Sequence, residues 1–368
     1  MHLLKLPTIA KDRIFKYMEV HEIFLLSTCS IVTRDAIKSS SLQSKYDGIK
    51  MTSTTYIKGS ISICSSQKED EFEKVIEWLN HNQPSSNRMK VGGLVIKFKI
   101  KFHPKTSVPC LHIEEYQKST PVELFNYITN LFKTTKVIEL RLRKTDFSDI
   151  SPAITSVKNV QMETYCQFAQ PRIFRSFLER VHVENCFISE QCVRGVPDRD
   201  TPLKHVQNLY LEQAVWVHQS LLLGFTGRHI YLENTKLRTY DMKDFVEQWV
   251  EGQICVNLET AIISTELVYR YGEVLQEVPS FYGQGRAHEG RYVYNAAFRD
   301  FFQKEFDFLD CADCHEITRM TDGVIASVKI LSETKSGVTR HYFFMFVWHD
   351  DNPVPGEFQN NEPGYRFL

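Results

Sequence analysis

A short apolar pattern repeats through the middle of the chain, and this repeat most constrains the fold. Two apolar residues with one other residue between them recur seven times between residues 111 and 258, at intervals of 20 to 29 residues. The pairs are Leu111/Ile113, Leu140/Leu142, Val160/Met162, Val181/Val183, Leu209/Leu211, Ile230/Leu232 and Val256/Leu258. Each pair fits a short strand, and the gaps leave room for a return segment. The pattern therefore predicts a mostly parallel sheet with the returns packed against it.

Helical patterns fill some of the gaps, at residues 121–132, 172–177 and 243–250. A strand with a return segment every 20 to 29 residues resembles the leucine-rich-repeat pattern. Asn185 and Asn234 stand roughly where such repeats place an asparagine, whose side chain can satisfy open backbone groups of a loop. The alternative is an α/β domain whose strands happen to be evenly spaced. Both interpretations predict an α/β fold.

The first forty residues predict three short helices, over residues 7–19, 22–30 and 32–37. Pro7 suits a helix start, where the missing N–H costs nothing. Leu25 and Leu26 are adjacent, so the second helix leaves apolar surface on more than one side. So short a segment buries its own apolar surface poorly. It needs either the rest of the chain or a partner.

The order Leu6-Pro7, an amphipathic helix, a turn, then residues 23–30 (Ile-Phe-Leu-Leu-Ser-Thr-Cys-Ser) resembles the F-box. Many F-boxes carry Lys or Arg followed by Trp where this chain has Thr33-Arg34-Asp35. The resemblance implies docking on the Skp-type adaptor of a cullin–RING ubiquitin ligase. It also implies that seven residues form the adaptor-binding surface or support it. These are Leu6, Pro7, Ile9, Ile14, Ile23, Leu25 and Leu26. The alternative is a helical subdomain packed on the neighbouring domain, with no partner.

Between the helices and the repeat, residues 49–64 and 91–102 have the composition of strands, and residues 69–79 predict a helix with Phe72, Val75, Ile76 and Leu79 on one face. Residues 97–102 (Lys-Phe-Lys-Ile-Lys-Phe) alternate strictly, which places the lysines on one face of a strand and the apolar residues on the other. A solvated sheet face or a lysine-guarded edge explains this strip. A strip that tracks nucleic-acid phosphates is the alternative.

The last third predicts a loop over 269–294, a helix over 296–308 and strands at 317–320, 324–331 and 341–348. Asp322-Gly323 is a turn signal, so the last three strands form an antiparallel β meander. The whole layout resembles nematode-type F-box proteins with an F-box-associated domain. It implies three parts: an F-box at 1–45, a leucine-rich-repeat-like recognition region at 46–265 and an F-box-associated region at 266–368.

Composition is that of a globular protein, with 42% hydrophobic residues, 24% charged residues and a net charge of −1. The near-neutral net charge gives the chain as a whole no electrostatic attraction to nucleic acid. Nine irregularly spaced cysteines favour reduced thiols, and hence the cytoplasm and/or the nucleus. Neither a signal-peptide core nor a membrane span is expected.

Chemical motifs are few. Cys311, Cys314 and His315 have the spacing of haem attachment or of half a zinc site, but no second Cys-x-x-Cys exists. Residues 283–290 contain Gly-x-Gly without the dinucleotide spacing. We therefore expect no catalysis, cofactor or metal. The expected function is the substrate-recognition subunit of an SCF-type ligase, which binds the adaptor and an unknown target protein. The alternatives are a leucine-rich-repeat-like interaction module without a ligase role and a nucleic-acid binder.

Overall fold

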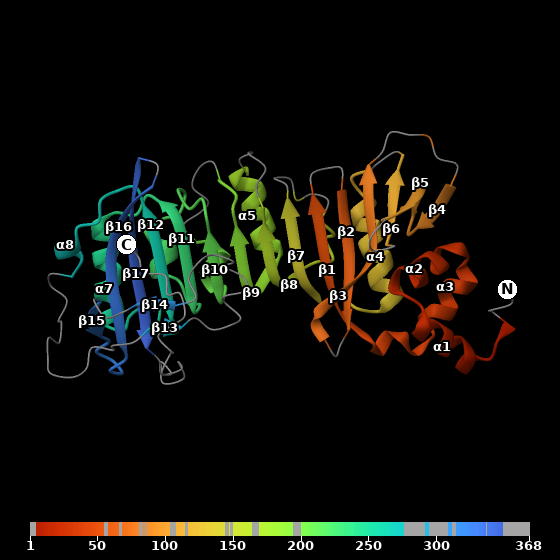
Figure 1. Cartoon of the computed structure of the whole chain (residues 1–368), viewed down its shortest axis with the longest axis horizontal. Helices are drawn as coiled ribbons and strands as arrows, with labels where there is room; N and C mark the ends of the chain where they lie inside the picture. The colour runs from red at the N-terminus through yellow and green to blue at the C-terminus, as the bar shows by residue number, and fades with distance from the viewer. Residues whose placement is uncertain are drawn as a thin grey trace, which may run out of the picture. The chain divides into compact units, whose positions relative to one another are not determined.

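The computed structural model describes residues 5–54, 58–65, 68–80, 84, 87–103, 108–114, 117–143, 147, 150–163, 169–193, 200–275, 291–293, 308–310, 314–335 and 337–348. The structure is mixed α/β, as the sequence predicts (Figure 1). The chain divides into two compact units. The first comprises residues 1–165 and 180–184, and the second comprises residues 166–179 and 185–368.

Three short helices begin the first unit and confirm the prediction for this stretch: α1 (Thr8–Tyr17), α2 (Val20–Cys29) and α3 (Ile31–Lys38). Local capping explains where they break. The Glu19 backbone N–H donates to Oε2 of Glu22 at 2.9 Å, which closes a capping box at the start of α2. The Ser30 hydroxyl accepts from the N–H of Thr33 at 3.0 Å and caps α3.

The strands of the first unit follow in the spatial order β8-β7-β1-β2-β3-β6-β5-β4. Their bounds are β1 (Tyr46–Thr54), β2 (Lys58–Ser65), β3 (Lys68–Asn80), β4 (Asn87–Val91), β5 (Leu94–Phe102), β6 (Pro109–Ile113), β7 (Val137–Arg143) and β8 (Ser156–Met162). The pairs β1/β7, β7/β8 and β3/β6 are parallel, and the other described pairs of this unit are antiparallel. Helix α4 (Thr120–Phe132) precedes β7 and confirms the helix predicted there.

The helix predicted over residues 69–79 is wrong, because these residues belong to β3. A β-bulge accounts for the misleading pattern. Ile61 of β2 lies opposite Ile76, and the next residue, Ser62, lies opposite Lys74, so Val75 is the extra residue. Val75 and Ile76 are adjacent and both fully buried. A bulge in this position breaks the alternation of a strand and imitates the spacing of a helix.

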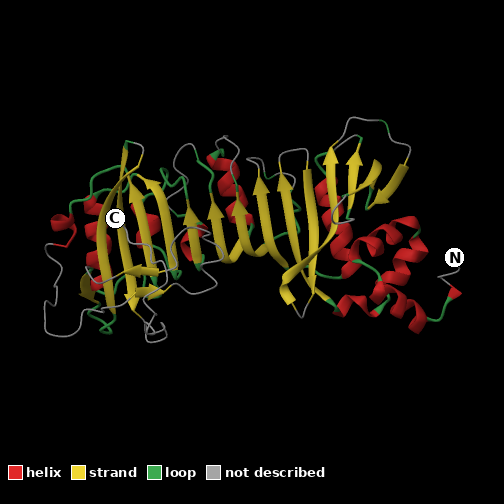
Figure 2. Cartoon of the chain, viewed as in Figure 1, coloured by secondary structure: helices red, strands yellow, loops and turns green. Residues whose placement is uncertain are grey.

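The second unit has the strand order β9-β10-β11-β12-β17-β16-β15. Its strands are β9 (His182–Ser189, whose first three residues belong to the first unit), β10 (Asn208–Leu211), β11 (His229–Thr235), β12 (Thr260–Thr265), β15 (His315–Thr318), β16 (Ile325–Lys335) and β17 (Val338–Trp348). Its helices are α5 (Pro171–Arg180), α6 (Gln219–Leu223), α7 (Thr239–Val250) and α8 (Tyr271–Leu275). β9 to β12 pair in parallel, as the repeat predicts. α5 and α7 lie behind the strands in Figure 2.

Two of the predicted strand cores are displaced. Phe187, not Val181 or Val183, lies opposite Leu209 in the parallel register, and Val183 sits near the start of β9. The core predicted at Val256/Leu258 is wrong, because a turn occupies that position and β12 begins at Thr260. Cys255 has φ +50° and Val256 is 52% exposed, so the backbone reverses there before the strand starts.

The antiparallel meander predicted at the end is confirmed by the pairing of β15 with β16, β16 with β17, and β17 with β12. Gly323 and Gly337 have φ +76° and +81° at the two reversals, a conformation that favours glycine. Helix α8 lies within the stretch predicted as a loop, and a small pair, β13 (Arg291–Val293) with β14 (Phe308–Asp310), is also present. The predicted helix over 296–308 lies almost entirely outside the described residues, and so does the tail from residue 350.

Of the two predicted asparagines, Asn234 bonds to a backbone group of a neighbouring turn, whereas the side chain of Asn185 meets the side chain of Asn208. Nδ2 of Asn234 donates to the carbonyl oxygen of Glu212 at 3.1 Å, and Asn234 itself has φ +55°. Asn185 accepts through Oδ1 from Nδ2 of Asn208 at 2.9 Å. Each contact joins one strand-and-return segment to the next. The three-part division of the chain stays a prediction.

We expect Asn234→Ala to lower the free energy of unfolding by about 1–2 kcal/mol, because alanine loses this hydrogen bond and tolerates a left-handed conformation poorly. Urea denaturation measures the change. Asn234→Gly is the control, since glycine adopts φ +55° freely and isolates the side-chain bond. Equal stability of the wild type and the alanine variant would show that the bond contributes nothing.

Candidate protein interface on the N-terminal helices

Large apolar side chains are exposed on and around α1 and α3. Of the thirteen such side chains among the described residues, five lie between residues 6 and 32. They are Leu6 (38% exposed), Ile9 (76%), Tyr17 (90%), Ile31 (66%) and Val32 (63%). Exposed apolar side chains that recur within one short stretch of chain are candidates for a surface that another protein covers. These three helices are therefore the candidate functional site.

The residues predicted to form this site divide into three groups. Leu6, Pro7 and Ile9 are exposed at the start of α1 and are free to contact a partner. Ile14, Leu25 and Leu26 are half-buried. Ile23 is fully buried, so its part is to support the helices and not to touch a partner.

Sequence reasoning missed three exposed residues, Tyr17, Ile31 and Val32. A signal for two of them was present. Ser30 is a good N-cap residue, and the residues directly after a cap occupy the first turn of a helix. Ile31 and Val32 therefore stand on the first turn of α3, where their exposure depends on what lies beside that turn. Tyr17 ends α1, and nothing in the pattern distinguishes it from a buried aromatic residue.

The side of α2 that carries its buried residues packs against the rest of the first unit. Val20, Ile23 and Phe24 are buried, where α2 packs against β3 and β4. The Phe24 ring meets the Tyr127 ring of α4 edge to face, with ring centres 5.9 Å apart. Helix α3 also packs against α4. Helices α2 and α3 are thus packed onto the first unit, and α1 buries Phe15.

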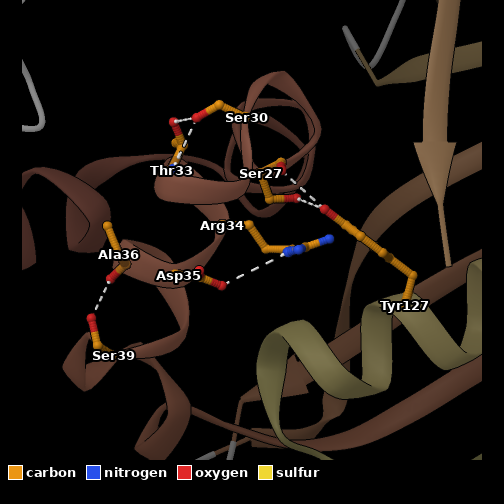
Figure 3. A network of polar contacts seen from close by, with 8 residues as sticks. All are labelled: Ser27, Ser30, Thr33, Arg34, Asp35, Ala36, Ser39 and Tyr127. Atoms are coloured by element: carbon orange, nitrogen blue, oxygen red, sulfur yellow. Dashed lines mark hydrogen bonds and ion pairs between the residues drawn. The ribbon is translucent and has the colours of Figure 1, made fainter.

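Polar contacts reinforce this packing (Figure 3). The Tyr127 hydroxyl donates to the carbonyl oxygen of Ser27 at 3.0 Å and lies 2.9 Å from the Ser27 hydroxyl. The Ser27 hydroxyl in turn donates to the carbonyl oxygen of Phe24 at 2.6 Å. Burial raises the pKa of Tyr127, so the phenol keeps its proton and remains a donor. These bonds join residues one hundred positions apart in the sequence.

Among the described residues outside these helices, one pair of side chains has the geometry of a nucleophile and a base. The hydroxyl of Ser332 lies 2.7 Å from Nδ1 of His341 on the neighbouring strand, a contact that sequence spacing does not reveal. A nucleophile and base also need an orienting acid, and none of the described carboxylates bonds to His341. The described residues therefore form no catalytic triad here.

The described part of the chain was also compared with what a metal site or a reactive thiol requires. There, no group of three or more His, Cys, Asp and Glu side chains is placed to hold a metal ion. Cys311 and residues 283–290 lie outside the described residues, and Cys314 is half-buried. No disulfide joins any two of the seven described cysteines. Burial raises the pKa of Cys255 to about 12, which suppresses its thiolate.

The comparisons with known proteins add no family. No protein-family model, no curated protein and no solved structure matches this chain. Within the described residues, no helix has both the length and the apolar character that crossing a membrane requires.

Proposed function

We propose that this chain is the substrate-recognition subunit of an SCF-type cullin–RING ubiquitin ligase. Helices α1–α3 would be its F-box and would bind a Skp-type adaptor, and the strand-and-return segments would be a leucine-rich-repeat-like region that presents a target protein. The proposal places the chain in the cytoplasm and/or the nucleus. The observation that carries it is the exposure of Ile9, Ile31 and Val32 on a set of short helices of which α2 and α3 pack onto the first unit.

The physical basis is the burial of apolar surface. Covering an exposed isoleucine or valine gains about 25 cal/mol per Å² of apolar area removed from water. A few well-packed apolar residues dominate the affinity of most interfaces. The chain itself would perform no chemistry. It would raise the concentration of the target near the ubiquitin-carrying enzyme, which is a proximity effect.

The test is adaptor binding by variants that place a charge in the exposed surface. We expect Ile9→Asp and Val32→Asp each to weaken binding to a purified Skp-type adaptor by at least about tenfold, because a carboxylate buried in the interface has no partner. Surface plasmon resonance measures the affinity. Both side chains are exposed, so circular dichroism should show an unchanged fold.

Val268→Asp is the matched control, since Val268 is 64% exposed but lies in the second unit. It should bind the adaptor like the wild type. A wild-type chain that is folded and does not bind the adaptor would contradict the proposal.

The second candidate is a leucine-rich-repeat-like interaction module without a ligase role, in which the helices only cap the sheet. The packing of α2 on β3 and β4, and of α3 on α4, favours this reading. The same measurement separates the two, because a capping role predicts no adaptor affinity in the wild type.

A further inference from the structure

The last strands of the second unit leave part of a strand edge without a neighbour. Strand β16 has eleven residues, and β17 pairs with all of them on one side. On the other side β15 pairs only with residues 325–328. Among the described strands, none pairs with that side of residues 329–335, which we call the β16 edge.

The hairpin geometry shows which backbone groups of the β16 edge point outward. A two-residue connection joins β16 to β17, so the pair that closes the hairpin exchanges hydrogen bonds, and bonded and non-bonded pairs alternate from there. Side chains lie closer together in a non-bonded pair. The hydroxyls of Thr334 and Thr339 lie 2.9 Å apart, and the Ser332 hydroxyl lies 2.7 Å from Nδ1 of His341. The N–H and C=O groups of Ile330, Ser332 and Thr334 therefore point away from β17.

The residue before β15 turns toward a face of the sheet and not along the β16 edge. The first residue of β15, His315, lies opposite Val328. Cys314 packs against the apolar cluster that contains Phe344 and Phe346, which lies on one face of the sheet. Ser332 and Thr334 are exposed. The outward backbone groups of the β16 edge are therefore accessible to another chain.

An accessible strand edge of this kind binds an extended peptide by adding it to the sheet as a further strand. The backbone groups supply the hydrogen bonds, and side chains at alternate positions supply the selectivity. Proteins protect edges against such pairing with proline, bulges or charges. The β16 edge has no proline and no bulge in its register with β17, and its residues 330–332 are uncharged.

Lys329 and Leu331 determine which side chains an added strand should have. Both are half-buried, and they lie on the same face of the sheet because they are two residues apart. Residues directly opposite on neighbouring strands have Cβ atoms about 5 Å apart and interact. An acidic residue opposite Lys329 and an apolar residue opposite Leu331 are therefore favourable. On the added strand these two residues are also two positions apart.

A second copy of this chain fits the β16 edge less well. Two copies paired antiparallel about Ser332 would set Glu333 of each copy against Leu331 of the other. A carboxylate that faces an apolar side chain loses water and gains no partner across the strands. The β16 edge therefore favours a segment of a different protein.

We propose that the β16 edge binds an extended segment of another protein, with an acidic and an apolar residue at alternate positions. The inference rests on the proposed function in one respect only, that the segment belongs to the recruited target. Target recognition then belongs to β16, whereas adaptor binding belongs to α1–α3.

The test measures binding of the full chain to a labelled peptide, Glu-Thr-Leu-Thr-Leu-Thr-Glu. Its order is the same in both directions, so it fits either strand orientation. Fluorescence anisotropy should show saturable binding. Hydrogen exchange should slow at the amides of Ile330, Ser332 and Thr334 when the peptide binds, because these N–H groups gain acceptors. The amides of Lys329 and Leu331 already bond to β17 and should change little.

Ser332→Pro should weaken peptide binding at least about tenfold, because proline removes the central outward N–H, which β17 does not use. Ser332→Ala is the matched control, since it keeps this N–H, and it should bind like the wild type. Lys329→Glu should weaken binding about fivefold and should prefer a peptide with Lys in place of Glu. All three variants should bind the Skp-type adaptor like the wild type, which also shows that they are folded.

The inference is overturned if the wild type does not bind the peptide, if Ser332→Pro binds like the wild type, or if Lys329→Glu still prefers the acidic peptide. It is also overturned if sedimentation shows self-association of the wild type that Ser332→Pro abolishes, because a second copy then occupies the edge. A wild type that binds the peptide and not the adaptor would contradict the proposed function and support the β16 edge as a docking site, so the two failures are distinguishable.

Discussion

Phe24→Ala is expected to lower the free energy of unfolding of the first unit by about 3–5 kcal/mol. Phe24 is fully buried, and its ring packs edge to face against Tyr127. Alanine leaves a cavity between α2 and α4 and removes this ring contact. Chemical denaturation measures the loss, and hydrogen exchange should show faster exchange in α2 and in α4.

The matched control is Tyr17→Ala, which also truncates an aromatic residue of these helices. Tyr17 is 90% exposed, so its truncation should change stability by no more than about 0.5 kcal/mol. The two variants also separate two causes of lost adaptor binding. Phe24→Ala acts by loosening the support of the helices, whereas a charge at Ile9 acts at the surface. Equal stability of Phe24→Ala and the wild type would contradict the packing described for α2.

The second large effect is expected in the second unit, where Trp249→Ala should cost about 3–5 kcal/mol. Trp249 lies in the last turn of α7 and is fully buried. The guanidinium of Arg319 lies 5.1 Å from the centre of its ring, and Arg319 also pairs with Asp322 at 2.7 Å. Alanine removes both the packing and the cation–π contact. Thermal denaturation and hydrogen exchange over β15 and β16 measure the effect.

Tyr240→Ala is the control on the same helix, because Tyr240 is 61% exposed near the start of α7. It should leave exchange in β15 and β16 unchanged. Faster exchange confined to α7 in the Trp249 variant would contradict the link to the turn at Arg319.

The predictable parts of this fold are those that depend on local pattern. The helices of residues 8–38 follow from caps and short apolar stripes, and the meander follows from turn residues such as Gly323. Parallel pairing follows from return segments too long for a hairpin. The errors share a different cause. The bulge at Val75 depends on the register with β2, and the turn before β12 depends on the left-handed conformation of Cys255. Apolar spacing identifies neither feature: the bulge gives a helix-like spacing, and the turn contains the strand-like pair Val256/Leu258.

The candidate site shows the same division. The resemblance to the F-box implies that Leu6, Pro7 and Ile9 supply the adaptor surface or its support, and the structure exposes all three. The pattern cannot reveal which side of α2 meets the sheet, because that side is chosen by Phe24 and Ser27 contacting Tyr127 one hundred residues later. Spacing alone therefore does not predict that Ile23 is fully buried whereas Leu25 is half-buried.

The pairing of β12 with β17 also sets the order in which the second unit is completed during synthesis. β12 ends at Thr265, but its antiparallel neighbour spans Val338–Trp348, so the ribosome must make more than seventy further residues before the pair can form. All six residues of β12 are buried in the finished unit. Until β17 arrives, this strand has an open edge that any other extended chain can join. Stalled or truncated products that end before Val338 are therefore aggregation-prone and natural clients for chaperones.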